Sequence, residues 1–561
     1  MSATPTTLTT PSAAADANTQ ELIPTENIEG IKGIIIAFLM ALVFRAFIIE
    51  GFEIPTGSMA PTLMGAQTIA HADASGYEWP VGPVSMIQGT STPTPRQSYS
   101  TLDPMSRAEV RASDVPIRSG DRVFILKYLW PLYTPSRYDV VVFKNPRDPT
   151  MNYIKRLVGL GPEEVAIVDG DVFSRPIAAD GKGEPATTNT WMLPGWTVTR
   201  KPESAQRVMW QAVFDTRYTP LNAVKDGRTW FRSPWVAEDA SAKSWQIDGK
   251  SEYRYEGSGA TSLSWDLTRR VISDYYPYNF GYAPSASPQP VGQYPVSDVR
   301  TIVEIKPDAA MTSVAFQVAT RKHEFRISVD GTAATLSMRA QGATDWNQLG
   351  TGTLPAALEP GKVTSLEFWH SDQSLSLFVN SQFVARGDYK WTPNDRLVNT
   401  MGLTADEVFK TEQNLLMDGA RITQPRVSVS FAGGPFTLVR LSLDRDIHYQ
   451  AGNYLPVNDP TPSTRPSVHS RARQPSAATH PRQPVYLAEG EYFNCGDNSP
   501  ASLDARLWDT PYPWVGQNTG KIGVIGRDAM IGRAFIVYWP GVYWKYSFLP
   551  IPDLGRVRQI R

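Results

Sequence analysis

The chain has 561 residues, of which 41% are hydrophobic, so it is long enough to bury two or three cores. Its formal net charge of −1 provides no basic footprint of the kind that nucleic-acid-binding proteins carry, and we expect no nucleic-acid partner. With one cysteine, Cys495, and six scattered histidines, the sequence excludes an intramolecular disulfide and has no metal-ligand spacing, so we expect neither a metal ion nor a cofactor.

The N-terminal region predicts a disordered tail followed by a membrane anchor. Residues 1–29 are rich in Thr, Ala and Ser and contain no Lys or Arg, a composition typical of disorder. Residues 31–49 carry only Lys32 and Arg45 as charges and approach the roughly 20 residues that a spanning helix needs, so we place a transmembrane anchor at 30–50. A cleavable signal peptide is the alternative. We favour an uncleaved anchor because no small-x-small cleavage site precedes the end of the apolar run.

A serine-containing turn follows the anchor directly. Ser58 lies in the string Pro-Thr-Gly-Ser-Met at residues 55–59, a few residues beyond the predicted bilayer surface. A serine beside a glycine is most often a turn residue. The alternative is a nucleophile for a bond at the membrane face, which requires a partner base elsewhere in the chain. Residues 64–119, which come next, are polar and turn-rich, and we assign them no chemistry.

A candidate base lies in an apolar strand. The residues at 140–143 and 153–158 predict two strands joined by a loop that contains Pro146, and Lys155 lies within the second strand. An ordinary lysine has a pKa near about 10.4. Burial among apolar groups lowers the pKa and yields a neutral, proton-accepting amine. The strand alone does not decide between this role and a lysine that extends to solvent at the sheet edge.

The middle of the chain predicts a large β-rich insertion. Residues 174–294 are rich in tryptophan, and we expect these rings to be core residues rather than a sugar platform. Residues 295–456 contain short alternating segments separated by turn signals, which predict an all-β sandwich. The string at 366–384 resembles concanavalin-like and laminin-G-like jelly rolls. Residues 457–484 are rich in Pro, Ser and Arg and predict a disordered linker.

A third polar block follows the linker. The string Gly-Asp-Asn at 496–498 opens a segment that contains Ser502, Asp504 and Arg506. Alone, this block is typical of an Asx turn with a surface salt bridge. Cys495 directly precedes it, and we expect this thiol to be inert core packing because no histidine stands near it in the sequence.

Taken together, the three blocks resemble those of bacterial type I signal peptidases, or leader peptidases, which use a Ser/Lys dyad. The blocks keep the family's order, and their strings are Pro-Thr-Gly-Ser-Met-Ala-Pro-Thr-Leu at 55–63, Tyr-Ile-Lys-Arg at 153–156 and Gly-Asp-Asn-x-x-x-Ser-x-Asp-x-Arg at 496–506. The resemblance covers residues 31–63, 120–173 and 485–540. It departs from the family at Thr56, where serine is usual, and at residues 161–162, where Gly-Pro inverts the usual order.

The resemblance implies catalytic roles for four residues. Ser58 would be the nucleophile and Lys155 the general base. Thr56 would contribute to the oxyanion hole, and Ser502 would accept a hydrogen bond from the Lys155 amine and orient it.

The resemblance also implies supporting residues around the dyad. An ion-pair network beneath the site would comprise Arg156, Asp504 and Arg506. Shallow apolar pockets for small substrate side chains would be lined by Phe52, Ile54, Pro55, Met59, Leu63, Val142, Tyr153 and Ile154.

The fold class implied is mainly β, with a signal-peptidase-type β catalytic core behind one N-terminal transmembrane helix and an inserted β-sandwich of the jelly-roll type. The two parts of the core would be residues 51–173 and 485–561. Because every candidate catalytic residue lies outside residues 174–484, we expect this insertion to be dispensable for the chemistry.

The function implied is the removal of signal peptides from exported preproteins with small residues at P1 and P3. The chain would be a single-pass protein of the inner (cytoplasmic) membrane, in contact with membrane lipid and with its catalytic domain on the outer, periplasmic face. Two alternatives stay open. One is a membrane-anchored binding protein whose sandwich holds an unidentified ligand and whose peptidase is weakened or inactive. The other is a self-cleaving, repressor-like Ser/Lys protease, which would need a DNA-binding module before the serine.

Overall fold

The computed structural model describes residues 25–83, 94–128, 134–146, 148–225, 227–238, 242–274, 294–309, 311–452, 474–508, 520–521, 523–545 and 549–560. The predicted disordered tail up to residue 24 and the predicted linker from 457 to 473 lie outside these residues. Residues 25–29, which were also predicted to be disordered, instead form the first turn of a helix. The chain divides into two units, residues 1–50 and 51–561.

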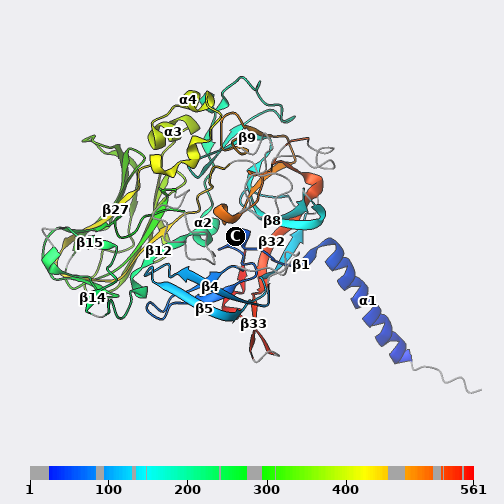
Figure 1. Cartoon of the computed structure of the whole chain (residues 1–561), viewed down its shortest axis with the longest axis horizontal. Helices are drawn as coiled ribbons and strands as arrows, with labels where there is room; N and C mark the ends of the chain where they lie inside the picture. Colours follow the sequence, from blue (N-terminus) through cyan, green and yellow to red (C-terminus); the bar gives the residue numbers. More distant parts are fainter. Residues whose placement is uncertain are drawn as a thin grey trace, which may run out of the picture. The chain divides into compact units, whose positions relative to one another are not determined.

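The first unit contains one helix, α1 (Thr25–Phe47), drawn in blue in Figure 1. Within it, Glu29–Phe47 has a mean hydropathy of 2.0 and is the one helix, among the residues described, that is long and apolar enough to cross a membrane. Its large side chains are open to the surroundings, as Ile34 (72% exposed) and Phe38 (64% exposed) illustrate. Such an all-round apolar exposure is typical of a helix whose solvent is lipid.

The main sheet of the second unit combines the two ends of the sequence. Its eight strands include segments from before and after the insertion, and every strand pair with a known register is antiparallel. The predicted strands at 140–143 and 153–158 are confirmed as β7 and β8. In the order β1-β6-β32-β7-β8-β30-β31, with β35 beside β32, the strands are β1 (Ile49–Glu53), β6 (Arg122–Lys127), β32 (Met530–Trp539), β7 (Val140–Asn145), β8 (Asp148–Leu160), β30 (Glu491–Cys495), β31 (Ile525–Gly526) and β35 (Arg558–Gln559).

A second, four-stranded sheet also joins both sides of the insertion. Its order is β11 (Thr197–Val198), β10 (Asp171–Pro176), β9 (Glu163–Val168) and β29 (Val485–Leu487). The helices α3 (Pro393–Met401) and α4 (Ala405–Phe409) each begin with a threonine capping box, and their apolar side chains share a core cluster with residues of β9 and β10. A third helix, α2 (Glu203–Met209), follows β11.

The predicted β-sandwich is confirmed, and the fold class is mainly β. Two antiparallel sheets enclose one large apolar cluster, to which alternate residues of their strands contribute. The first sheet comprises β12 (Gln211–Asp215), β16 (Trp245–Gln246), β17 (Tyr253–Tyr255), β19 (Val299–Pro307), β24 (Thr364–Ser371), β25 (Ser374–Val379), β26 (Gln382–Asp388) and β28 (Phe436–Arg445). The second comprises β15 (Trp235–Ala237), β18 (Thr261–Trp265), β20 (Met311–Thr320), β21 (His323–Asp330), β22 (Ala333–Ala340), β23 (Asn347–Thr353) and β27 (Arg426–Gly433).

The tryptophan-rich segment contributes strands to this sandwich. Most of its indole rings are buried, which confirms the prediction that they are core residues; Trp230, at 39% exposed, is the exception among them. The remaining strands form two-stranded hairpins: β2 (Thr68–His71) with β3 (Glu78–Val81), β4 (Arg96–Leu102) with β5 (Glu109–Pro116), β13 (Val224–Lys225) with β14 (Arg228–Thr229), and β33 (Val542–Lys545) with β34 (Leu549–Pro552).

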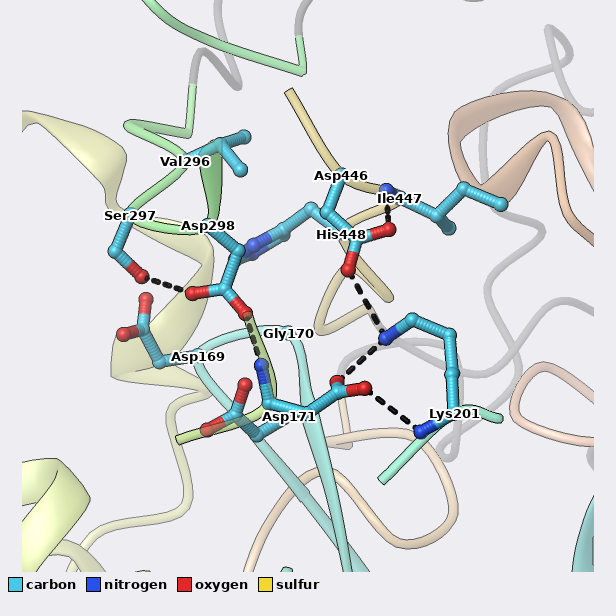
Figure 2. A pocket seen from close by; sticks show the side chains of 11 residues that line it. Asp169, Gly170, Asp171, Lys201, Val296, Ser297, Asp298, Asp446, Ile447 and His448 are labelled. Atoms are coloured by element: carbon cyan, nitrogen blue, oxygen red, sulfur yellow. Dashed lines mark hydrogen bonds and ion pairs between the residues drawn. The ribbon is translucent and has the colours of Figure 1, made fainter. Parts of the chain in front are cut away.

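A buried ion network, called here the ion joint, connects the β9–β10 turn to the sandwich. Asp169 accepts hydrogen bonds from Arg321 at 2.7 and 2.8 Å and forms an ion pair with Arg396 at 2.8 Å. Figure 2 shows Lys201 pointing at Asp446, with 3.0 Å between the amine and the carboxylate. The other members of the network are Asp171, Asp298 and Asp372.

Three carboxylates of the ion joint are close enough to hold a metal ion. Those of Asp171, Asp298 and Asp372 have oxygens within 4.8 Å of one another. Cationic side chains already face these groups, because Lys201 lies 2.5 Å from Asp372 and Arg396 lies 3.5 Å from Asp171. The arrangement therefore fits a salt-bridge network that fastens the sandwich to the smaller sheet.

The insertion also supplies core residues beneath the catalytic sheet. The apolar cluster that contains Val141 and Leu157 includes several side chains from the insertion, among them Met209, Tyr449 and Ala477. Residues 476–480 belong to a segment whose composition predicts disorder, yet all five are nearly fully buried. The insertion thus shares a hydrophobic core with the peptidase strands, which changes the expectation that it is dispensable.

Replacing residues 174–484 with a short Gly/Ser hairpin is now expected to prevent folding. The deletion would remove both cationic partners of the buried Asp169 and uncover the core under β7 and β8. Thermal unfolding followed by circular dichroism should show no cooperative transition. As a control, removing the exposed turn residues 342–344 should leave the transition in place. A deletion variant that folds and cleaves peptide would contradict this expectation.

Candidate active site

Ser58 lies in a single 3₁₀ turn, η1 (Gly57–Met59), that follows β1. The turn is fastened on one side by Met59 and Leu63, which are fully buried in the apolar cluster of the main sheet. On the other side, the backbone N–H of Asn498 donates to the Ser58 carbonyl at 3.0 Å, and the Asn498 side chain donates to the Gly57 carbonyl at 3.1 Å. Because of these contacts, the half-buried Ser58 is held between two segments that are far apart in the sequence.

Gly496 permits this close approach. A Cβ atom at position 496 would lie 2.6 Å from the Ser58 carbonyl oxygen and 2.1 Å from Ser502 Oγ, which is too close for any side chain. The glycine of the Gly-Asp-Asn string is therefore required where the third block packs against the nucleophile turn.

Lys155 meets Ser58 from the neighbouring strand β8. Its Nζ donates to Ser58 Oγ at 2.8 Å and to the Ile154 carbonyl at 3.1 Å, and its side chain is 4% exposed. Burial lowers the pKa of Lys155 to about 8, against the opposing pull of the Asp504 and Asp497 carboxylates. At this pKa, a substantial fraction of the amine is neutral near physiological pH.

The cleavage rate is expected to rise with pH because only neutral Lys155 accepts a proton. Below the pKa of about 8, the neutral fraction and with it kcat/KM should increase about tenfold per pH unit, and both should level off above it. The measurement is kcat/KM for a short peptide between about pH 6 and pH 10. A flat profile, or an inflection that disappears when a histidine is replaced, would contradict the assignment of Lys155 as base.

The predicted ion-pair network consists of two separate pairs. Arg156 does not pair with Asp504; its guanidinium makes hydrogen bonds of 2.8 and 2.7 Å to Asp497, with both side chains fully buried. Asp504 instead accepts from Arg506 at 2.9 and 2.8 Å. Burial tends to raise the pKa of Asp504, but the adjacent Arg506 guanidinium holds it below the ordinary value.

The predicted hydrogen bond between Lys155 and Ser502 is not present in the structure. The sequence predicts a hydrogen bond from Lys155 to Ser502, but Lys155 Nζ bonds to Ser58 and to the Ile154 carbonyl instead. Ser502 is 4% exposed, its Oγ makes no hydrogen bond to Lys155, and its hydroxyl contributes, after Arg506, to holding the pKa of Asp504 below the ordinary value. It lies against Gly496, between the Asp504–Arg506 pair and the nucleophile turn.

Two further predicted residues take distinct positions. Thr56 is exposed, and its Oγ1 lies 3.5 Å from Ser58 Oγ, the outer limit of a hydrogen bond. Cys495 is fully buried as a free thiol, and burial raises its pKa well above the ordinary value, as expected for inert packing.

Six of the eight predicted pocket residues contribute to one apolar cluster beside the dyad. Met59 and Leu63 have no exposed surface and support the others from beneath, while Pro55 is exposed and Tyr153 packs against the neighbouring cluster. The six are Phe52, Ile54, Met59, Leu63, Val142 and Ile154.

Sequence reasoning missed Asp497 and Asn498 as parts of the site. Both belong to the Gly-Asp-Asn string, so the signal was present. Their partners, Arg156 and the nucleophile turn, are more than 300 residues away in the sequence, and spacing alone does not reveal such pairings.

Several known proteins are similar to parts of this chain. Signal peptidase I of Pseudomonas aeruginosa is 28% identical over 152 residues, covering 26% of this chain and 38% of that protein. Signal peptidase I of Pseudomonas fluorescens is 33% identical over 121 residues, covering 22% and 28%. That of Rickettsia typhi is 30% identical over 135 residues, covering 24% and 38%. The chain therefore spans at most 38% of the length of these relatives.

Two solved structures are similar to part of the chain. A laminarinase from Rhodothermus marinus covers 43% of this chain with 10% identity and a TM-score of 0.24. The exoplasmic/lumenal domain of VIP36 covers 40% with 9% identity and a TM-score of 0.23.

The model of one protein family matches on both sides of the insertion. This family, described as "Signal peptidase, peptidase S26", matches residues 27–231 and 400–539, which together make up more than half of the chain and include Ser58, Lys155 and the Gly-Asp-Asn string. The chain therefore belongs to the S26 signal peptidase family.

Proposed function

We propose that this protein is a membrane-bound serine endopeptidase that removes N-terminal signal peptides from exported preproteins. The observation that carries the proposal is the 2.8 Å contact between Lys155 Nζ and Ser58 Oγ, made by a lysine that is almost completely buried. A buried amine in contact with a serine hydroxyl supplies both parts of a nucleophilic mechanism, the attacking oxygen and the base that takes its proton.

In the proposed reaction, neutral Lys155 accepts the proton of Ser58 as Oγ attacks the scissile carbonyl. The resulting ammonium then protonates the leaving amine, which leaves an acyl ester on Ser58. Water, deprotonated by Lys155, hydrolyses the ester and regenerates the hydroxyl. The Ser58 backbone N–H and the Thr56 hydroxyl would stabilise the oxyanion, with about 3 kcal/mol from each well-placed donor.

Substrate choice follows from the apolar cluster beside the dyad. The partly buried Phe52 and Ile154 offer contact surface without charge, and the buried Ile54, Met59, Leu63 and Val142 leave little depth behind them. Such shallow walls favour small residues, such as alanine, at P1 and P3.

The apolar helix supports a location at the membrane. It ends at Phe47, shortly before Ser58 in the chain, so the substrate bond would be cut close to the bilayer. We place the catalytic part on the outer face of the inner membrane, where exported preproteins emerge.

One experiment tests the proposal directly. The full chain, solubilised in detergent, is incubated with a preprotein that carries an Ala-x-Ala cleavage site, and the new N-terminus is sequenced. We expect a single cut after the second alanine that is absent with the Ser58→Ala variant. Intact preprotein after prolonged incubation, with the enzyme shown to be folded, would instead favour a binding protein with an inactive peptidase.

Replacing Ser502 by alanine is expected to lower kcat without abolishing it. In this proposal Ser502 orients the base during turnover but takes no part in bond formation, so KM should stay unchanged. The unfolding temperature should change little, because Asp504, which lies beside Ser502, keeps its hydrogen bonds from Arg506 and from the Gly496 N–H. An unaltered kcat in Ser502→Ala would show that Ser502 does not orient the base.

A further inference from the structure

A cleft of about 460 Å³ lies at one end of the sandwich, and none of the residues assigned to catalysis lines it. It is bordered by the β20–β21 turn, by the C-terminal part of α3 and by the segment that leads into β27. Its volume falls within the range of small-molecule binding sites. The residues that line it are Leu267, Ala319, Thr320, Arg321, Lys322, Gln341, Asn399, Thr400, Thr423, Gln424 and Arg426.

All the charged residues that line the cleft are positively charged. Three of the lining residues are cationic, and none is acidic. Arg321 is neutralised by Asp169 in the ion joint. Lys322 donates to the Val398 carbonyl at 2.9 Å, and in the described part of the chain neither Lys322 nor Arg426 has a carboxylate partner. Two exposed positive charges are therefore available to an anion.

The uncharged lining is made mostly of hydrogen-bonding groups. Gln341, Asn399 and Gln424 each provide an amide, and three threonines provide hydroxyls, whereas two small or aliphatic residues are the apolar part. Thr400 donates to Asp169 at 3.0 Å, the Gln424 side-chain carbonyl accepts from the Ile272 N–H at 3.3 Å, and more of the exposed lining is apolar than polar. The cleft therefore suits a ligand that combines hydroxyls with carbon faces, as a sugar ring does.

The β20–β21 turn is held rigidly in a costly conformation. Arg321 and Lys322 have φ values of +49° and +57°, a backbone region in which two-residue hairpin turns normally use Asn and Gly. The Arg321 side chain is fixed by Asp169, and Lys322 by the carbonyl at the end of α3. The Asp372–Gln373 and Asn380–Ser381 turns of the sandwich have similar φ values, so the conformation is a recurrent hairpin geometry that places Lys322 at the edge of the cleft.

We propose that this cleft binds a small polyhydroxylated anion of the acidic-saccharide class. The carboxylate would lie between Lys322 and Arg426, and the amide side chains would bind the ring hydroxyls. The inference does not depend on the peptidase activity, because none of the lining residues belongs to the proposed catalytic site.

The test is isothermal titration of the detergent-solubilised full chain with digalacturonic acid, with maltose as a neutral disaccharide and with inorganic phosphate as an anion without hydroxyl-bearing rings. We expect binding of digalacturonic acid in the millimolar range or tighter, and no heat from maltose. The variant Lys322→Gln/Arg426→Gln should bind at least about tenfold more weakly, because it loses two charge-assisted contacts. The Ser58→Ala variant should bind like the unaltered chain.

A matched control separates the cleft from general surface charge. Lys250→Gln/Lys306→Gln removes two exposed cations elsewhere on the sandwich sheets and their loops, and it should leave binding unchanged. Unfolding temperatures of both double variants should equal that of the unaltered chain, because the replaced side chains are exposed. Absence of binding at millimolar digalacturonic acid, unchanged binding by Lys322→Gln/Arg426→Gln, or equally tight binding of phosphate would each overturn the proposal.

Discussion

Replacing Ser58 by alanine or Lys155 by methionine is expected to abolish cleavage, with kcat falling by about 10³-fold or more in each case. The physical reason is that the two residues act as a unit. The Ser58 hydroxyl needs a base to take its proton, and the Lys155 amine contributes nothing without a hydroxyl to deprotonate. The double variant should therefore be no slower than either single variant. The measurement is kcat for a preprotein in excess over the protein, supported by the single-turnover rate constant for its cleavage.

A neighbouring lysine provides the matched control for this experiment. Lys144 lies on β7, beside β8, but its side chain is exposed and it makes no contact with Ser58. Lys144→Met should retain the kcat of the unaltered enzyme. Near-normal turnover in Lys155→Met, or multiplicative losses in the double variant, would show that a different residue acts as the base.

The second large effect is expected on stability, from the buried pair of Arg156 and Asp497. Both side chains are completely buried, and Arg156 also donates to the Tyr138 carbonyl at 2.7 Å. Replacing Arg156 by methionine leaves the Asp497 carboxylate buried without its cation, which should lower the free energy of unfolding by about 3–5 kcal/mol. Denaturant unfolding of the full chain in detergent measures the difference.

A double variant distinguishes the lost pair from lost packing. Arg156→Met combined with Asp497→Leu removes both charges, so it should recover much of the stability that the single variant loses. By contrast, Arg111→Met breaks an exposed ion pair with Glu109 and should change stability little. A double variant as unstable as Arg156→Met would mean that side-chain packing, rather than the unpaired charge, causes the loss.

The strands and the dyad were predictable because their signals are local. Apolar runs predict β7 and β8 without reference to the rest of the chain, and Tyr-Ile-Lys-Arg places Lys155 within the second of them. The Ser58 turn is likewise recognisable from a short string. These features depend on residues that are adjacent in the sequence.

What the sequence did not predict depends on contacts between distant segments. The resemblance implied one network of Arg156, Asp504 and Arg506, but the partner of Arg156 is decided by which carboxylate lies opposite β8 in the folded sheet, and that carboxylate is Asp497. Residues 476–480 have the composition of a linker, yet they are buried because the returning chain must cross the core to reach β29. The composition of a segment does not predict which other parts of the chain pack against it.

The place of β32 in the catalytic sheet has a consequence for biosynthesis. This strand comes from residues 530–539 and lies between β6 and β7, and the asparagine that fastens the nucleophile turn is residue 498. A ribosome, which adds about 5–20 residues per second, completes these segments long after it has made Ser58 and Lys155. During most of its synthesis the polypeptide thus has a serine and a lysine but no sheet to bring them together. If the proposed activity holds, the growing polypeptide would be unable to cut its own membrane-proximal segment, or neighbouring chains, before residues 498–539 have been made.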